Sequence, residues 1–228
     1  MRLPITPVTT LWRELRDEVR RRNPGGRVIV AIDGVDGAGK TTFADGLAEV
    51  FAEKGAAVYR ASIDGFHRPR SERYARGRTS PDGFYRDSFD YGTFRRVLID
   101  PFRDGAQTSG ATGFQLASFD VARDAVEESQ WVTAPRDAVL VVDGIFLHRP
   151  ELRDLWDWSL WLDVPEPVAA RRLADRDGSD PDPEAPSNAR YRQGQRIYLR
   201  EAQPQAAASA IVDNSDLAHP RRTARESG

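Results

Sequence analysis

The 228-residue chain contains no cysteine. This absence excludes disulfide frameworks, thiolate zinc sites and cysteine nucleophiles. The sequence also has no apolar run near the roughly 20 residues that a bilayer-spanning helix needs. Its first residues, 1–15, show none of the apolar core of a signal peptide. We therefore expect a cytoplasmic protein with no membrane partner.

A strong charge of either sign is missing as well. Thirty-three basic and 35 acidic residues leave a formal net charge of -2. Without a basic field the chain has no general attraction for nucleic acid, so we expect no such partner. With 39% hydrophobic and 30% charged residues, the composition is typical of a globular domain large enough to bury a core.

Short apolar runs alternate with helical patterns along the chain. Residues 27–33 and 138–143 are rich in β-branched side chains and predict buried parallel strands. This alternation indicates an α/β fold with a doubly wound, mainly parallel sheet flanked by helices. Further strands are expected at 57–62, 114–120, 160–164 and 210–212.

A glycine-rich motif follows the first buried strand. Residues 34–41 match G-x-x-x-x-G-K-[ST], whose glycines let the backbone amides curl around phosphate oxygens. Lys40 is expected to reach the β- and γ-phosphates, and the Thr41 hydroxyl to contact Mg²⁺. The helix that begins here adds its N-terminal dipole. The predicted nucleotide contacts in the motif are Gly34, Asp36, Gly37, Ala38, Gly39, Lys40, Thr41 and Thr42.

Two carboxylates follow other strands of the predicted sheet. Asp143 ends the buried run 138–142 and is a candidate Mg²⁺ ligand, directly or through water. Asp64 lies just beyond the strand at 57–62, where strand ends face the ligand crevice. It is the candidate base for an acceptor hydroxyl and a second candidate metal contact. His67 is the rival base.

Arginines form two further candidate sites. Arg172 and Arg176 lie four residues apart on one helical face and could close over phosphates as a lid. Six arginines, at positions 68, 70, 73, 76, 78 and 86, could bind an anionic acceptor or could simply be solvated. Tyr85 among them could stack on a base or hold the loop in place.

Five segments occur in the order seen in uridine kinases: 33–42, 64–67 (DGFH), 86–90 (RDSFD), 142–146 and 176–177. Over roughly residues 27–214 the chain thus resembles the uridine kinase/phosphoribulokinase family of P-loop kinases. The resemblance implies a five-stranded parallel sheet and transfer of the γ-phosphoryl of ATP–Mg²⁺ to a 5′-hydroxyl or similar alcohol. By the same resemblance Asp64 is the base, Arg176 a lid arginine, and Asn214 lies near adenine.

The acceptor side of the resemblance is less complete. Asp87 or Asp90 matches an acidic residue that binds ribose hydroxyls, and Asp143 stands where relatives usually have Glu. Residues 118–124 keep the aromatic Phe119 of a base-binding segment but lack its histidine. The expected substrate contacts are Asp64, His67, Tyr85, Asp87, Asp90 and Phe119.

These observations predict one kinase domain, residues 1–217, with an acceptor-binding region at 64–124 and a lid at 171–190. The tail, 218–228, is expected to be flexible. The expected partners are ATP or GTP and a small acceptor, first of all a nucleoside such as uridine, and a homo-oligomer is compatible with the family. Pantothenate, a sugar phosphate, glycerate or a ribosyl-pyridine are alternative acceptors. A non-catalytic nucleotide-binding regulator is the alternative outside enzymes.

Overall fold

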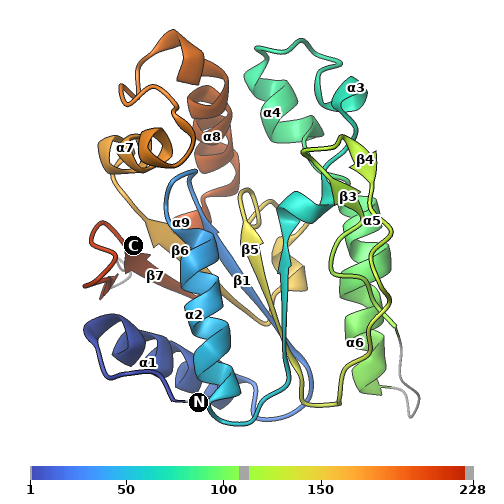
Figure 1. The fold of residues 1–228 in the computed structure, drawn as a ribbon. Helices are drawn as coiled ribbons and strands as arrows, with labels where there is room; N and C mark the ends of the chain where they lie inside the picture. The colour runs from blue at the N-terminus through green and yellow to red at the C-terminus, as the bar shows by residue number, and fades with distance from the viewer. Residues whose placement is uncertain (1, 108–112, 224–228) are drawn as a thin grey trace.

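The computed structural model describes residues 2–107 and 113–223 as a three-layer α/β fold (Figure 1). Its central sheet has the strand order β2-β5-β1-β6-β7-β8. The first five strands are parallel, and β8 runs antiparallel to β7. The strands are β1 (Val28–Gly34), β2 (Val58–Ser62), β5 (Val139–Gly144), β6 (Trp158–Asp163), β7 (Ala210–Asp213) and β8 (Arg221–Thr223).

Helices cover both faces of this sheet, which explains why its inner strands are continuously apolar. On one face, Val28, Val30 and Ile32 of β1 pack against α1 (Pro7–Arg22) and α2 (Lys40–Ala52). On the other face, Ile29 and Ala31 join a second core. This core includes side chains from α4 (Pro81–Asp87), α5 (Tyr91–Phe94), α6 (Asp100–Gln107) and α8 (Ala189–Ala202).

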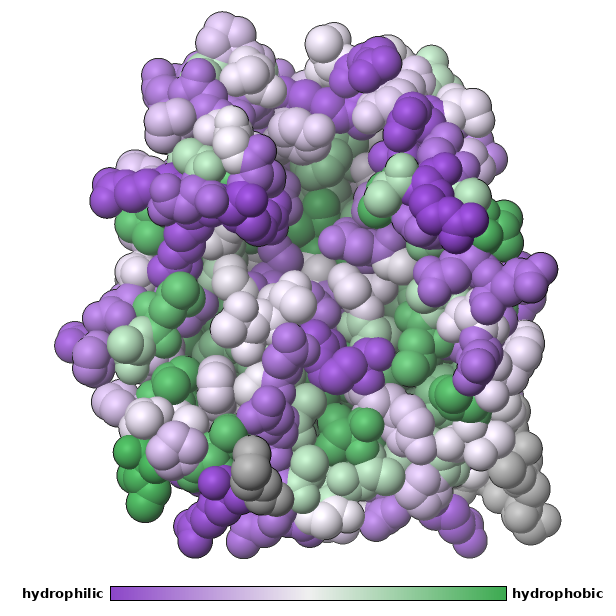
Figure 2. All heavy atoms as spheres, viewed as in Figure 1, coloured by the Kyte–Doolittle hydropathy of each residue, from purple (hydrophilic) through white to green (hydrophobic). Residues whose placement is uncertain are grey.

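Two groups of short elements rise above the carboxyl ends of the strands (Figure 1). One group, the lid lobe, consists of α7 (Glu166–Asp177), the loop 178–188 and α8. The other, the acceptor lobe, contains α3 (Arg70–Arg73), α4, β3 (Phe119–Asp120) and β4 (Ala125–Val126). Figure 2 shows the surface hollowed between the two lobes, with hydrophobic residues at the bottom of the hollow.

The remaining short elements connect these layers. The 3₁₀ turns are Ile63–Phe66, Arg153–Leu155 and Pro186–Asn188, a π-helical segment spans Arg95–Ile99, and α9 is Pro204–Ala207. None of the helices in the described part of the chain is long and apolar enough to cross a bilayer.

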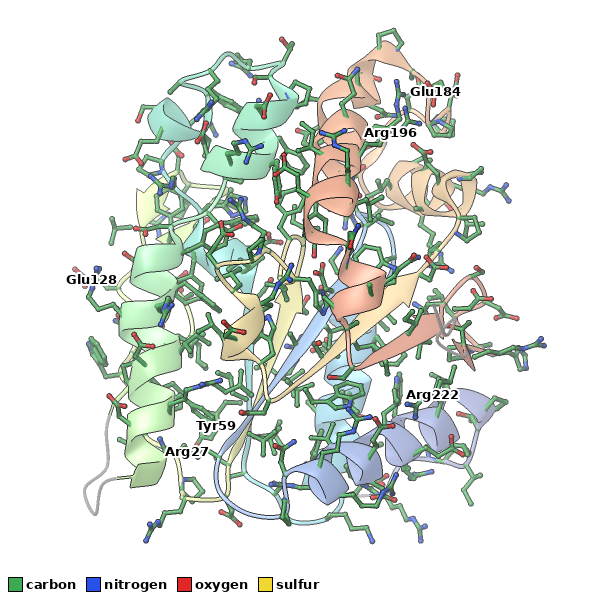
Figure 3. The ribbon with its side chains drawn as sticks, turned by 180° about the vertical axis from the view of Figure 1, so that it is seen from behind. Arg27, Tyr59, Glu128, Glu184, Arg196 and Arg222 are labelled. Carbon is green, nitrogen blue, oxygen red and sulfur yellow. The ribbon has the colours of Figure 1, made fainter. Side chains whose placement is uncertain are left out.

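The structure differs from the sequence prediction at two strands. The expected strand at 114–120 is reduced to β3, because Phe114 makes only an isolated bridge to Val132. The segment expected to be a flexible tail from 218 contains β8, which adds a sixth, antiparallel strand. Arg222 of β8 forms an ion pair with the buried Glu18 of α1 (Figure 3), and this pairing fixes the strand. Residues 224–228 of that predicted tail lie outside the described residues.

Candidate functional site

The glycine-rich loop between β1 and α2 is shaped by its glycines. Gly37 and Gly39 have φ angles of +77° and +85°, a region that other residues rarely adopt. A Cβ on Gly37 would lie 2.4 Å from the carbonyl oxygen of Ala169 in α7, so the loop packs directly on the lid lobe. Lys40 opens α2, and its Nζ lies 2.8 Å from the carbonyl oxygen of Val35 across the loop. The loop therefore forms an anion cradle at a helix N-terminus.

Two side chains that we predicted to contact nucleotide donate hydrogen bonds to the backbone in and beside this loop. The Asn214 Nδ2 donates to the carbonyl of Ala38 at 2.7 Å, and its side chain is buried. Arg172 donates to the carbonyls of Gly37, Asn214 and Ser215. Burial lowers the pKa of Arg172. Both side chains thus brace the backbone in and beside the loop, and their contact with nucleotide stays a prediction.

The predicted metal-binding pair is assembled. The Thr41 hydroxyl donates to Asp143 Oδ2 at 2.7 Å, and Asp143 is only 2% exposed. A hydroxyl and a carboxylate are the hard oxygen ligands that Mg²⁺ prefers. Within the described residues no group of three or more Asp, Glu, His or Cys side chains could hold a metal ion. The residues fit an Mg²⁺ that would take its other ligands from phosphate oxygens and water.

Asp64 follows β2 in a 3₁₀ turn, and its side chain is 65% exposed. Because Asp143 is paired in register with Ser62 of β2 and Ile32 of β1, Asp64 and the phosphate loop leave the same edge of the sheet. Burial raises the pKa of Asp36 in the loop, the Lys40 charge opposes this, and the Asp64 charge adds to it. Asp64 therefore follows a strand that ends at the same edge of the sheet as the strand before the phosphate loop, and its role as base stays a prediction.

His67, the rival base, is engaged locally. Its Nδ1 lies 2.8 Å from the backbone carbonyl of Asp64, and its ring packs on Phe89 with the centroids 4.5 Å apart. Burial lowers the pKa of His67. The imidazole is therefore placed to fix the turn that carries Asp64, and the exposed carboxylate is the better candidate base.

Several of the predicted acceptor contacts are engaged within the protein. Tyr85 is a core residue, 2% exposed, with its ring 5.1 Å from that of Phe146, and Phe119 is also buried. Asp90 caps α5 by accepting from the Thr93 amide and hydroxyl, and these bonds hold its pKa below the usual range although burial raises it. Burial of Tyr85 and Phe119 opposes their prediction as substrate contacts, whereas Asp90 caps a helix and its substrate contact stays a prediction.

The arginine-rich stretch is largely neutralised by acidic partners. Arg76 pairs with Asp87 at 2.7 Å. Asp87 is the other residue predicted to bind ribose, so its carboxylate already has an ionic partner. The remaining pairs are Arg68–Glu72, Arg73–Asp124, Arg86–Asp82 and Arg86–Glu201. Only Arg70 and Arg78 of the six lack an acidic partner within the part of the chain described, so the structure favours the solvated interpretation of this stretch.

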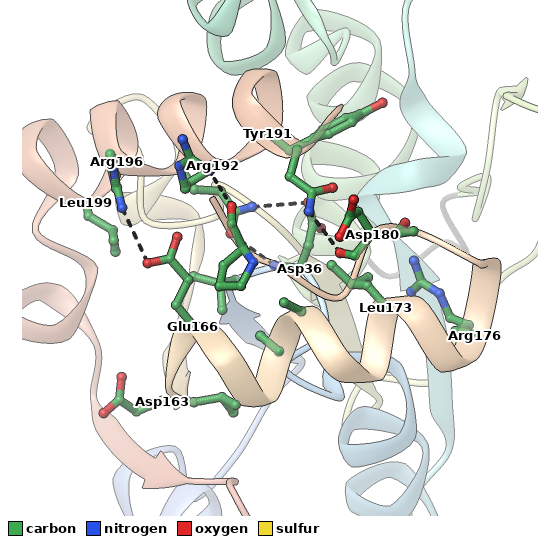
Figure 4. Close-up of a pocket in the computed structure, with 18 of the residues that line it drawn as sticks. Asp36, Asp163, Glu166, Leu173, Arg176, Asp180, Tyr191, Arg192, Arg196 and Leu199 are labelled. Carbon is green, nitrogen blue, oxygen red and sulfur yellow. Dashed lines mark hydrogen bonds and ion pairs between the residues drawn. The ribbon is translucent and has the colours of Figure 1, made fainter. Parts of the chain in front are cut away.

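Arg176 lies on α7 and borders a pocket between α7 and α8 (Figure 4). The pocket has a volume of about 540 Å³, and Asp36 and Gln195 also line it. The Arg176 side chain is 68% exposed and pairs with its neighbour Asp177 at 2.8 Å. Burial raises the pKa of Asp36, and the charge of Arg176 opposes that rise after the charge of Lys40. Arg176 and Asp36 of the phosphate loop thus line the same pocket, and the Arg176 guanidinium is largely exposed.

A buried network at the start of the phosphate loop was not predicted. Asp33 Oδ1 accepts from the amide of Gly34, and Asp33 Oδ2 lies 2.8 Å from His148 Nδ1. The Tyr198 hydroxyl of α8 donates to the same oxygen. Asp33 directly precedes the phosphate-loop motif, but no local signal links it to partners 115 and 165 residues away. This network fastens α8 to the loop.

No family model matches the chain. A uridine kinase from Leuconostoc citreum (strain KM20) is 26% identical over 151 residues, which are 66% of this chain and 68% of that protein. A candidate fructose transport system kinase from Silicibacter sp. TM1040 is 26% identical, with a TM-score of 0.65 over 84% of this chain and 95% of that one.

The fold is shared more widely. A candidate uridine kinase from Bacillus stearothermophilus has a TM-score of 0.62 at 22% identity, covering 87% of this chain and 98% of that one. A D-glycerate 3-kinase from Cryptococcus neoformans has a TM-score of 0.60 at 10% identity, over 96% of this chain and all of that one. At these identities the likeness concerns the fold alone.

Proposed function

We propose that this chain transfers the γ-phosphoryl of ATP to the 5′-hydroxyl of a nucleoside such as uridine, because it is similar to a uridine kinase in sequence and to kinases in fold. One observation carries the proposal. The phosphate loop with Lys40 and Thr41, the buried Asp143 and the exposed Asp64 leave adjacent strand ends at one edge of the sheet. A binding loop alone would not need the exposed carboxylate beside it.

The proposed reaction is an in-line displacement at the γ-phosphorus. The acceptor oxygen forms a bond to phosphorus, the bond from phosphorus to the β–γ bridging oxygen breaks, and ADP leaves with that electron pair. Asp64 accepts the proton of the attacking hydroxyl. Lys40 and the loop amides hold the phosphates, and Arg176 closes over the charge that develops on them. Mg²⁺, held by Thr41 and Asp143, would neutralise charge on the β- and γ-phosphates.

A sugar is the second candidate acceptor. The relative named as a candidate fructose transport system kinase is 26% identical to this chain and covers 84% of it. In addition, residues 118–124 lack the histidine of the uridine kinase segment, and Phe119 is buried. Neither a histidine in this segment nor an exposed Phe119 ring is therefore present to contact a nucleoside base, and this favours a sugar.

An acceptor panel tests the proposal. The purified protein is incubated with Mg²⁺ and ATP or GTP plus uridine, cytidine, fructose, glycerate, pantothenate or nicotinamide riboside. ADP or GDP release and product mass are measured. We expect uridine-dependent turnover that Lys40→Ala abolishes. Turnover with fructose and none with uridine would establish the second candidate. Nucleotide binding without turnover on any acceptor would support a non-catalytic regulator.

A further inference from the structure

The guanidinium of Arg60 in β2 lies between two carboxylates. Its Nε contacts Asp45 Oδ1 of α2 at 2.9 Å, and its Nη2 contacts Asp143 Oδ1 of β5 at 2.9 Å. Its Nη1 donates to the carbonyl of Val141 at 2.8 Å. All three nitrogens are therefore engaged, and the backbone contact holds the group at the edge of the candidate metal site.

Arg60 completes the surroundings of the Asp143 carboxylate. Oδ2 accepts from Thr41 and Oδ1 accepts from Arg60, and the residue is almost fully buried. A buried carboxylate without a positive partner would be strongly unfavourable. The Thr41 hydroxyl is neutral, so among the described contacts Arg60 supplies the balancing charge.

A divalent cation at Thr41 and Asp143 would share this carboxylate with Arg60. The two positive charges would repel each other at short range in a poorly solvated site. A nucleotide triphosphate would bring several negative charges to the neighbouring loop and offset that repulsion. Asp45, which is largely exposed, already contacts the same guanidinium and can keep it when Asp143 turns to a metal.

We propose that Arg60 is a positioning residue that makes metal binding at Asp143 depend on bound nucleotide. Without nucleotide, Arg60 balances Asp143 and disfavours a free divalent cation. With nucleotide, the cation takes the carboxylate and Arg60 remains with Asp45. This inference rests on the proposed kinase function, and it assigns a role to a residue outside the phosphate-loop motif.

Mn²⁺ binding followed by electron paramagnetic resonance tests the proposal, with and without the non-hydrolysable analogue AMP-PNP. The wild-type protein should bind Mn²⁺ weakly alone and at least about tenfold more tightly with AMP-PNP. In Arg60→Gln, Mn²⁺ alone should bind at least about tenfold more tightly than in wild type, because the repelling charge is gone. The variant should also melt at a lower temperature, and Mn²⁺ alone should restore part of the loss.

A second variant is expected to weaken Mn²⁺ binding where Arg60→Gln strengthens it. It also provides a test if Arg60→Gln does not fold. Asp45→Asn removes the alternative partner from an exposed position, so Mn²⁺ binding with AMP-PNP should weaken. Arg21→Gln, an exposed arginine of α1, is the charge-matched control and should change neither affinity.

The outcomes separate this inference from the proposed function. If wild type binds no AMP-PNP, the proposed function fails and the inference with it. If AMP-PNP binds normally but Arg60→Gln and Asp45→Asn leave both Mn²⁺ affinities at the wild-type values, the role of Arg60 is overturned while the kinase proposal stands.

Discussion

The exposed carboxylate of Asp64 carries the chemistry of the proposed reaction, and it can be tested by a nearly isosteric change. Asp64→Asn keeps the shape but cannot take a proton. We expect kcat to fall by about 10²- to 10⁴-fold. AMP-PNP affinity, measured by calorimetry, should change little, because the carboxylate is 65% exposed and, among the described contacts, accepts no hydrogen bond from the phosphate loop.

His67 provides the contrast for this prediction. His67→Asn keeps a donor near the Asp64 carbonyl, which the imidazole now contacts. We expect a loss of activity below about tenfold, since the base itself is unchanged. If His67→Asn lost more activity than Asp64→Asn, the histidine would be the base and our assignment would be wrong.

At the residue scale, the sequence predicts well where a motif fixes backbone geometry. The loop from Gly34 to Thr41 has the expected conformation because its glycines and lysine act within eight consecutive residues. The sequence predicts a side chain's role poorly where that role depends on partners far along the chain. Arg60 meets Asp143 across 83 residues, and Arg172 meets Asn214 across 42. No rule of sequence spacing predicts that these two arginine side chains already have partners within the protein.

Helix α1 is held to α2 by Glu53 at the end of α2. Its carboxylate accepts from Arg13 at 2.8 Å and from the Leu3 amide at 2.6 Å. The Arg13 hydrogen bond, then that of Leu3, lowers the pKa of Glu53 from 4.5 to about 2. A lowered folded-state pKa contributes stability above pH 4.5, and this contribution is lost as the pH falls from 4.5 toward 2.

Glu53→Gln should therefore unfold at a lower urea concentration than wild type at pH 7, and the difference should shrink between pH 4.5 and 2. Urea unfolding of both proteins, followed by circular dichroism at several pH values, measures it. Glu49→Gln, an exposed change on the same helix, is the control. A difference that stays constant over this pH range would show that the pKa of Glu53 is not lowered.

Elements follow from the sequence when they bury a continuous apolar run. β1 and β5 lie within one residue of their predicted bounds, because both sheet faces are covered and every residue of these strands is buried. β8 has no such signal, since its three residues are exposed and polar. It is a strand because β7 offers a free edge and Glu18 offers Arg222 a partner.

At the scale of the whole molecule, the lid lobe has a fixed part and a loosely held part. α8 is fastened to the phosphate loop by buried bonds from Tyr198 to Asp33 and by the paired bonds between Gln195 and Asp36. The loop 178–188 is tied to α8 mainly through Glu184, whose exposed carboxylate pairs with arginines of α8. Exposed ion pairs add little stability, so this loop and the end of α7 can move.

Closure of the lid lobe should bring Arg176 onto the transferring phosphoryl group. Arg176→Ala should lower kcat by about 10³-fold or more, because the charge stabilises the transition state. AMP-PNP affinity should fall by less than about tenfold, since the loop amides and Lys40 still hold the phosphates. Arg171→Ala, an exposed arginine on the same helix, is the matched control. Steady-state kinetics and calorimetry on both variants measure the two effects, and equal kcat values would mean that α7 does not close on the nucleotide.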